Sequence, residues 1–536
     1  MAALLLLVAC GASVDEAMAP VAAEVAPVAL TAERCNGNFI AHTLAHTTDV
    51  PGGNDVRMFE ANGGGVAIND LDGDGDLDIV LANHAGPNSI LWNDGDLQFR
   101  REPLGEGDAR AANIIDLDDD GRLDIVFTRT SSAPNFWHNM GDGIFMRELL
   151  PGVDKPLYAI NWADLDRDGD LDFVAATYDA ALLANFGHEF LSSNQAGVYV
   201  YTNDEGTFRA QRLAEQAQAL ALALVDLNGD GRLDIQVGND FAVPDFVWYW
   251  SDEGWLAQEP YDTTTHSTMS LDFADIDNNG QRELFASDMH PYQEDSETMA
   301  AWDPVMSSMM DDPHPPDDPQ TMANVLQMAD GAGWHDAAAA LGVNATGWSW
   351  SSKFGDLDQD GFVDLYVVNG FMEQTTFAHL PDHELVEENQ ALRNEGGTGF
   401  APMPRWNLGA TASGRGMSMA DLDGDGDLDI VVNNLRAPAQ LFENQLCGGH
   451  SLQVDLFWPG SGNERAIGAA LVLHSEEGSY YRDLKAASGY LSGDPARVHF
   501  GLPAGTNLTL EIIWPDGLHS TITDLPIDSL VTVTRP

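Results

Sequence analysis

Positive charge is scarce in this chain, and lysine is almost missing. The 536 residues include 24 Lys and Arg against 85 Asp and Glu, which gives a formal net charge of −61. The only lysines are Lys155, Lys353 and Lys485. A nucleic-acid ligand is therefore disfavoured, because phosphate contacts need a basic face. The acidic residues are dispersed along the chain, which is typical of a solvated surface suited to a salty medium.

Cysteine and long hydrophobic runs are also rare. The most apolar stretch, residues 1–10, is too short to span a bilayer. It ends in L-V-A-C, which resembles a bacterial lipobox, although no Lys or Arg precedes it. A lipid on Cys10 would then be the only membrane attachment; the alternative is a secretory signal with an incidental cysteine. Both interpretations predict an exported protein, either a bacterial outer-membrane lipoprotein or a secreted one. Residues 11–34 are rich in Ala, Val and Pro and are expected to form a flexible tether.

Signatures of catalysis are missing as well. The chain has no G-x-S-x-G, no H-E-x-x-H and no Cys–His pair of catalytic spacing. Its loop histidines are His266, His290, His335, His379 and His383, and scattered histidines are usually ordinary polar residues. His379 and His383 could share one helical face, but such a pair without a third ligand is a weak metal site.

A short acidic loop is what the chain has in abundance. The frame D-x-D-x-D-G-x-x-D begins at residue 70 as D-L-D-G-D-G-D-L-D and recurs at intervals of 46 to 81 residues, seven times in all. Four carboxylates within nine residues repel one another unless a cation lies among them. Oxygen ligands at alternate positions, with Gly75 for the sharp turn, suit Ca²⁺. An acidic turn without metal is a fair alternative for a single loop, but not for five complete ones.

Each loop supplies a predicted set of calcium ligands. In the first, Asp70, Asp72 and Asp74 offer side-chain oxygens, Asp76 offers its backbone carbonyl, and Asp78 closes the shell with both oxygens. The other complete loops supply Asp116, Asp118, Asp120 and Asp124; Asp164, Asp166, Asp168 and Asp172; Asp356, Asp358, Asp360 and Asp364; and Asp421, Asp423, Asp425 and Asp429. Two loops are expected to bind more weakly: Asp226, Asn228, Asp230 and Asp234; and Asp275, Asp277, Asn279 and Glu283.

Strand-like stretches flank the loops. Residues 66–68 precede the first loop and residues 79–81 follow it, so strand, loop and strand make a hairpin with the metal at its turn. Many units continue with a second hairpin of the pattern apolar-x-Asn-x-Gly-x-Phe, as at residues 91–99. Two hairpins make a four-stranded blade. Seven such blades predict an all-β chain whose main domain is a seven-bladed β-propeller with calcium-binding hairpin loops.

The two ends of the repeat array complement each other. The second hairpin of the last unit begins at Leu441 but lacks its Gly-x-Phe half, and that half is found at residues 35–39. We therefore expect the N-terminal segment to supply the final strand and a Cys35–Cys447 disulfide to lock the seam. Such a bridge would contribute roughly 4–6 kcal/mol in the chain-entropy model. The propeller would span residues 35–447, with an insertion at 289–332 that is either a binding loop or a tolerated mobile segment.

After Cys447 the acidic loops stop, and residues 448–536 alternate like the strands of a small β-sandwich. The repeats resemble the FG-GAP/VCBS type. The tail resembles the ASPIC/UnbV domain at residues 463–468 (N-E-R-A-I-G), 489–492 (G-Y-L-S) and 514–517 (W-P-D-G). The combination is similar to bacterial relatives of cartilage acidic protein. The resemblance implies a secreted or surface-attached calcium-binding protein, and it implies no catalytic mechanism.

Three functions remain open at this point. The first is a non-catalytic binding or adhesion scaffold for an extracellular protein or glycan. The second is a propeller enzyme, such as a lyase or dehydratase, acting on extracellular polysaccharide at the central channel. The third is a structural partner within an export or surface assembly.

Overall fold

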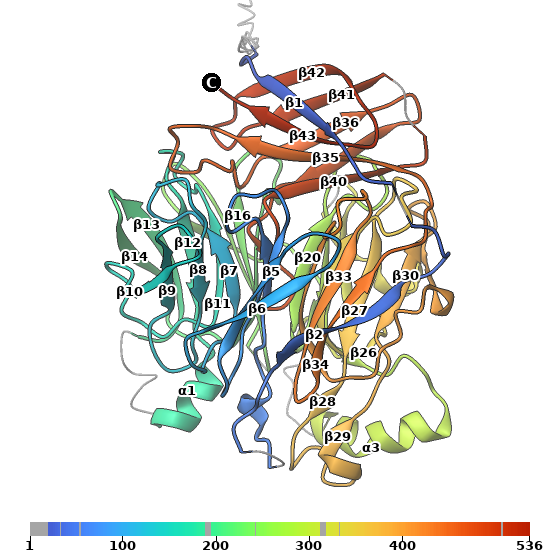
Figure 1. Ribbon diagram of the computed structural model, residues 1–536. Coiled ribbons are helices and arrows are strands. Elements are labelled where there is room, and N and C mark those ends of the chain that lie inside the picture. The colour runs from blue at the N-terminus through green and yellow to red at the C-terminus, as the bar shows by residue number, and fades with distance from the viewer. Residues whose placement is uncertain are drawn as a thin grey trace, which may run out of the picture.

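The computed structural model describes residues 20–32, 34–52, 55–187, 195–241, 243–310, 318–331, 333–504 and 507–536. Within these ranges the protein is all-β and of the β-propeller type, with a smaller two-sheet domain at one end (Figure 1). No helix of the described ranges is both long and apolar enough to cross a membrane. Cys10, the expected lipidation site, lies outside these ranges.

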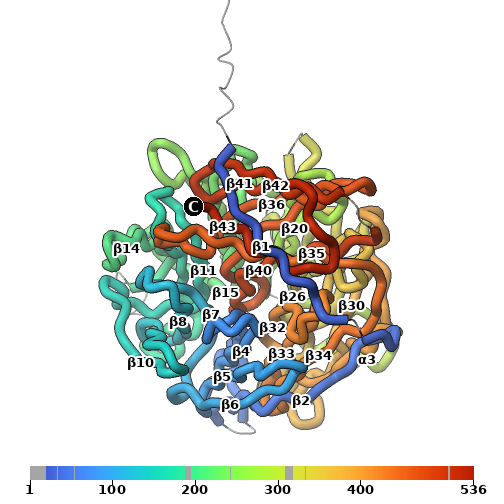
Figure 2. Tube along the Cα trace, turned by 45° about the horizontal axis from the view of Figure 1, so that its top comes forward, coloured from blue at the N-terminus to red at the C-terminus, as the bar shows by residue number. Residues whose placement is uncertain are grey.

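Seven sheets built on a common four-strand pattern follow one another along the described chain and surround a common axis (Figure 2). We number them sheets 1 to 7. Sheet 1 contains β3 (Val66–Asn69), β4 (Asp78–Leu81), β5 (Asn88–Asn93) and β6 (Phe99–Leu104), and sheet 2 contains β7 (Ala112–Ile115), β8 (Asp124–Phe127), β9 (Asn135–Asn139) and β10 (Phe145–Glu148). Sheet 3 contains β11 (Ala159–Ala163), β12 (Asp172–Ala176), β13 (Val198–Asp204) and β14 (Thr207–Ala214), and sheet 4 contains β15 (Ala219–Val225), β16 (Asp234–Asn239), β17 (Phe246–Tyr249) and β18 (Leu256–Gln258). Sheet 5 contains β20 (Ser270–Ala274), β21 (Glu283–Ser287), β24 (Val325–Ala329) and β25 (Trp334–Asp336). Sheet 6 contains β26 (Gly347–Gly355), β27 (Asp364–Asn369), β30 (Gln390–Asn394) and β31 (Phe400–Pro402), with β22 (Met289–His290) at the edge. Sheet 7 contains β32 (Gly414–Ala420), β33 (Asp429–Asn434), β34 (Pro438–Glu443) and β2 (Ile40–Thr47).

The first and last sheets are joined at a seam. The N-terminal strand β2 pairs antiparallel with β34, placing Ile40 opposite Glu443, which is the pairing that the sequence predicts. Cys35 and Cys447 form the expected disulfide, with Cα atoms 5.6 Å apart. Buried apolar residues of both sheets, such as Ile79 and Val431, share one core. Burying a side chain of this size contributes about 1.5–3 kcal/mol, so packing and covalent linkage both hold the seam.

The tail domain, residues 448–536, forms two four-stranded sheets together with residues 24–29. One of its sheets has the order β1 (Glu24–Ala29), β43 (Ser529–Thr534), β35 (His450–Phe457) and β40 (Arg497–Leu502); the other has β37 (Ser479–Asp483), β36 (Ala470–His474), β41 (Leu508–Ile513) and β42 (His519–Leu525). The inner faces of both sheets bury one apolar core, in which Val454 of β35 joins Leu471 of β36 and Leu510 of β41. Residues 24–29 form strand β1 and not the flexible tether expected there, because their backbone pairs with the whole length of β43.

A hairpin of the tail domain enters the ring of sheets. It consists of β38 (Ala487–Ser488) and β39 (Ser492–Gly493), which contact the first strands of sheets 1 to 5 and 7. Ser492 pairs in parallel with Ala112 of β7. The Tyr490 ring is fully buried at the hairpin tip, 5.0 Å from the Trp350 ring, and its hydroxyl accepts a 2.7 Å hydrogen bond from the Gly63 N–H. The G-Y-L-S segment thus reaches through the axis to the beginnings of the first strands, at the end of the ring away from the acidic loops.

The 289–332 insertion contains a docked helix. Helix α3 (Ser296–Met310) places Trp302 beside Trp348, with ring centroids 5.6 Å apart. Trp302 Nε1 also donates a 3.0 Å hydrogen bond to Glu387. Residues 311–317 lie outside the described ranges. The remaining short elements are α1 (Asp179–Phe186), α4 (Ala338–Leu341), η1 (Met58–Glu60), η2 (Pro381–His383), η3 (Pro404–Trp406), β19 (Thr264–Thr265), β23 (Gln320–Thr321), β28 (Phe371–Met372) and β29 (Glu384–Leu385).

Candidate metal centre: the acidic loops

The acidic loops are the turns between the first and second strands of the seven sheets. In sheet 1, β3 ends at Asn69, and β4 begins at Asp78, the last acidic residue of the loop. Gly75 has φ 99°, a conformation that residues with a side chain rarely adopt, and so permits the turn. The other loops have the same place, because the second strand begins at Asp124, Asp172, Asp234, Glu283, Asp364 and Asp429.

The last carboxylate of each loop also holds its hairpin together. Asp78 Oδ2 accepts the Leu71 N–H at 3.0 Å, and Asp78 Oδ1 accepts the Asn93 N–H at 2.9 Å. The corresponding bonds from the second loop residue reach Asp124, Asp172, Asp234, Glu283, Asp364 and Asp429. These carboxylates are at most 1% exposed. Each oxygen keeps a further lone pair, so one carboxylate can close the hairpin and still serve as a metal ligand.

Burial makes the ionised form of these groups costly. Burial, together with the other carboxylates of the same loop, raises the pKa of Asp78 to about 8 and that of Asp124 to about 7. Glu283 of the fifth loop behaves alike, with burial raising its pKa to about 8. Without a counter-charge such groups take up a proton near neutral pH. A bound cation favours the ionised form instead.

The donor atoms converge as a metal site requires. In the first loop, oxygens of Asp70, Asp72 and Asp78 lie within 4.8 Å of one another. The second, third and fifth loops bring together Asp116, Asp118 and Asp124; Asp164, Asp166 and Asp172; and Asp275, Asp277 and Glu283. Buried oxygens without a hydrogen-bond partner are found at Asp116 Oδ1, Asp164 Oδ1 and Glu283 Oε1. An all-oxygen donor set with unpaired buried oxygens fits a hard cation such as Ca²⁺.

The turn positions of the loops keep their geometry where the residue type changes. Asp72 Oδ1 accepts the Asp74 N–H at 3.3 Å. In the fourth loop Asn228 Oδ1 accepts the Asp230 N–H in the same way, at 2.9 Å. The amide therefore keeps the turn while removing one negative charge from the site, which is consistent with the weaker binding expected of this loop.

One neighbouring side chain differs from loop to loop, and no motif in the sequence points to it. The residue before the repeated Asn of the third strand lies beside the acidic loop. In sheet 6 this residue is Arg393, whose guanidinium pairs with Asp358 and Asp360. In sheet 7 it is Glu443: burial and Asp425 raise the pKa of Asp423 to about 7, and the charge of Glu443 adds to this rise. The sixth loop is thus partly neutralised by the protein itself, whereas the seventh gains negative charge.

The face that carries the loops is covered by the tail domain. The Asn463 N–H donates a 2.7 Å hydrogen bond to the Gly169 carbonyl of the third loop. Arg282, in the fifth loop, forms a two-pronged ion pair with Asp483 of the tail, at 2.9 and 2.8 Å. The candidate metal centres therefore lie at the interface of the two domains, and nothing in the loop frames themselves signals this.

His379 and His383, which could have shared one helical face, do not lie on an α-helix. The backbone from His379 to His383 forms turns and the 3-10 helix η2, and a 3-10 helix does not place residues i and i+4 on one α-helical face. His379 Nε2 instead lies 2.9 Å from the Ala301 carbonyl of α3. A two-histidine metal site on one helix is therefore excluded here.

Comparisons with known proteins agree with this architecture. The family model described as FG-GAP-like repeat matches residues 70–127, 116–175 and 383–432. The model described as ASPIC and UnbV matches residues 460–536. A search of curated proteins finds no match.

Solved structures are similar only remotely. BBS1N, crystallised in complex with ARL6DN, is 10% identical, with a TM-score of 0.41 over 77% of this chain and 98% of that one. The Vibrio cholerae biofilm matrix protein Bap1 is 13% identical, with a TM-score of 0.30 over 92% of this chain and 64% of that one. The Photorhabdus luminescens Tc holotoxin pore is 13% identical, with a TM-score of 0.31 over 90% of this chain and 20% of that one. The chain thus contains FG-GAP-like repeats and, at its C-terminus, an ASPIC and UnbV domain.

Proposed function

We propose that this protein is an exported, calcium-dependent seven-bladed propeller that works as a non-catalytic binding scaffold for an extracellular protein or glycan. The observation that carries the proposal is the set of buried carboxylates at the loop tips, whose oxygens converge within 4.8 Å. The Cys35–Cys447 disulfide and the FG-GAP-like repeats fit an extracellular protein, where oxidising conditions and free calcium are found. Attachment through a lipid on Cys10 is part of the proposal.

Calcium would be structural in this function. Extracellular calcium modules have dissociation constants of roughly 10⁻⁴–10⁻³ M. At about ten times that concentration each site adds roughly 1.4 kcal/mol to the free energy of unfolding. The ions would hold the loop tips rigid and offset the repulsion among the loop carboxylates on the face under the tail domain. A binding surface on the ring would therefore lose its shape when calcium is removed.

Thermal unfolding in calcium and in EDTA tests the metal. We expect EDTA to lower the Tm and added Ca²⁺ to restore it, whereas Mg²⁺ restores it poorly because it demands a smaller octahedral site. Asp172→Asn should reduce the calcium-dependent part of the Tm, and Asp252→Asn, an exposed change outside the loops, should leave it intact. An unchanged Tm in EDTA would refute a structural role for calcium.

Binding is tested separately. We expect the calcium-loaded protein, screened against glycans and extracellular proteins, to retain ligands that are released by EDTA. Retention that does not depend on calcium contradicts the scaffold proposed here.

The enzyme alternative has no observation in its favour. Catalytic propellers act at their central channel, and in this protein the buried Tyr490 hairpin occupies the axis at one end. Turnover of an acidic polysaccharide that is abolished by His266→Ala would reverse this preference.

A further inference from the structure

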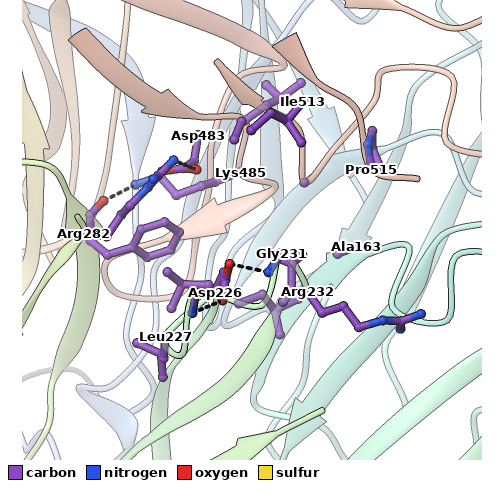
Figure 3. A pocket seen from close by; sticks show the side chains of 18 of the residues that line it. Ala163, Asp226, Leu227, Gly231, Arg232, Arg282, Asp483, Lys485, Ile513 and Pro515 are labelled. Carbon is purple, nitrogen blue, oxygen red and sulfur yellow. Dashed lines mark hydrogen bonds and ion pairs between the residues drawn. The ribbon is translucent and has the colours of Figure 1, made fainter. Parts of the chain in front are cut away.

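The tail domain leaves a cavity of about 400 Å³ over the third, fourth and fifth loops (Figure 3). The floor comes from the loop tips around Asp164 and Asp226 and from Arg282 before β21. The roof comes from the end of β37 with Lys485 and from the turn after β41 with Pro515. The cavity is therefore built from both domains, and neither would form it alone.

The lining of this cavity has a slight excess of basic residues, whereas the whole chain is strongly acidic. Its lining contains the basic residues Arg167, Arg232, Arg282 and Lys485 and the acidic residues Asp164, Asp226 and Asp483. The lining thus has four basic groups to three acidic ones, in a chain with 24 basic to 85 acidic. Two of the three acidic groups belong to the metal loops, whose ions would make the cavity more positive still.

Half of the basic groups already have carboxylate partners. Arg282 pairs with Asp483 through both prongs of its guanidinium. Lys485 pairs with Asp272, and its ammonium nitrogen lies 4.6 Å from the centre of the Phe273 ring. These two pairs clamp the tail domain onto sheet 5, and we assign them no role in ligand binding.

The other two basic groups have no such partner. Within the described ranges, neither Arg167 nor Arg232 has a carboxylate oxygen within ion-pair distance. Arg167 donates to the Gly231 carbonyl. The Arg232 guanidinium lies 5.1 Å from the centre of the Trp250 ring, and its buried Nη1 has no hydrogen-bond partner.

The two guanidinium groups come from neighbouring loops, and Arg167 donates to the carbonyl of Gly231, the residue before Arg232. The tail domain confines the Arg167 side chain, because its Nη1 is only 3.5 Å from the position that a Cβ of Gly517 would take. Two confined like charges at the edge of a partly buried cavity are stabilised when an anion lies between them.

We propose that this cavity binds a carboxylated sugar through Arg167 and Arg232. Each guanidinium presents a fork of N–H donors that matches the two oxygens of a carboxylate. Leu233, Ile513 and Pro515 provide an apolar wall for the body of the sugar. A volume of about 400 Å³ takes one or two sugar units. The inference deepens the proposed scaffold function and rests on it for the glycan class of ligand.

Calorimetry on the full-length, calcium-loaded protein tests the inference. The probes are galacturonate, tetragalacturonate, inorganic sulfate and the neutral sugar galactose. We expect galacturonate to bind at least tenfold more tightly than galactose, and sulfate to compete with it. Tighter binding of tetragalacturonate than of galacturonate would identify a polymer chain as the source of the anion, and equal binding would identify the free sugar acid.

Arginine variants locate the site. Arg167→Gln and Arg232→Gln should each weaken galacturonate binding about tenfold or more, whereas Arg147→Gln, an exposed change in β10, should not. Arg232→Lys keeps the charge without the fork and should lose part of the affinity. If both glutamine variants bind as the wild type does, or if galactose binds as tightly as galacturonate, the inference is overturned.

The same variants separate this inference from the proposed function. If calcium-dependent glycan or protein binding persists in Arg167→Gln and Arg232→Gln, the scaffold function stands and the cavity is not the sugar-binding site. If the wild-type protein retains no ligand on the screens but binds galacturonate, and the two variants lose that binding, the cavity is the sugar-binding site and the wider scaffold function is refuted.

Discussion

Asn93 Nδ2 donates a 2.8 Å hydrogen bond to the Leu422 carbonyl, so an asparagine of sheet 1 grips the acidic loop of sheet 7. The same bond links later sheets to the loop of the sheet before them. It runs from Asn139 to Leu71, from Asn394 to Ile276 and from Asn444 to Leu357. The repeated Asn therefore does more than form its own hairpin: it ties neighbouring loops together around the ring.

The disulfide should matter most at the seam. Replacing Cys35 and Cys447 with Ser frees a cross-link that spans 412 residues. We expect a loss of about 4–6 kcal/mol in the free energy of unfolding, because the unfolded chain regains the entropy of that loop. Urea unfolding of the double variant measures this. Reducing the wild-type protein should reproduce the loss, and identical midpoints for both proteins would contradict it.

The charge beside the loops should rank their calcium affinities. Arg393→Gln should strengthen calcium binding at the sixth loop, and Glu443→Gln should weaken it at the seventh. One unit charge at about 4 Å from a divalent ion is worth roughly 2 kcal/mol in water, or about thirtyfold in affinity. Calcium titration by calorimetry measures the change. Arg209→Gln, an exposed change in β14, is the control, and shifts of the same sign in both loop variants would contradict the ranking.

The docking of α3 should depend on pH. Glu387 accepts hydrogen bonds from Trp302 Nε1 and from the Trp348 N–H, and burial raises its pKa to about 7. A carboxyl whose folded pKa is raised contributes stability at low pH that is lost as pH rises through that value. We therefore expect hydrogen exchange in α3, corrected for the intrinsic rate, to speed up as pH rises from the ordinary pKa of 4.5 to about 7. Glu387→Gln should flatten this pH dependence; an equal slope in the variant would contradict the assignment.

The tail hairpin should stabilise the ring. Tyr490→Phe removes the hydroxyl that accepts from Gly63 and lies 3.3 Å from the Tyr158 hydroxyl, which should cost about 1–3 kcal/mol by leaving buried groups unpaired. Tyr490→Ala also leaves a cavity and should cost about 3–5 kcal/mol. Thermal unfolding measures both. Leu256→Ala, at an exposed position of β18, should have little effect, and a Tyr490→Ala protein as stable as wild type would show that the axis does not need the hairpin.

Local patterns in the sequence were enough to predict the repeats. The loop frame around Asp78, the strands beside it and the missing half-hairpin near Cys35 together predict the sheets, the closing strand and the disulfide, because each depends on residues close in sequence or on a plain complementarity of the two ends. The all-β sandwich of the tail follows in the same way from alternation.

Contacts between distant segments could not be predicted. Nothing near Tyr490 indicates that its hairpin enters the ring, and nothing near Arg393 indicates that its guanidinium reaches the carboxylates of a loop some 35 residues earlier. Residues 24–29 were expected to be a tether because Ala, Val and Pro dominate there, but an unpaired edge at β43 accepts them as a strand. In each case the partner surface, rather than the local sequence, decides the structure.

The path of the first described residues gives the molecule a polarity. The chain joins the tail domain at β1 before it reaches the ring, and α1 and α3 lie at the opposite end (Figure 1). From Cys10 to Glu24 the chain spans at most about 50 Å when fully extended. A lipid at Cys10 would therefore hold the tail domain toward the bilayer. The end of the ring that carries the helices would face outward, where large partners can approach it.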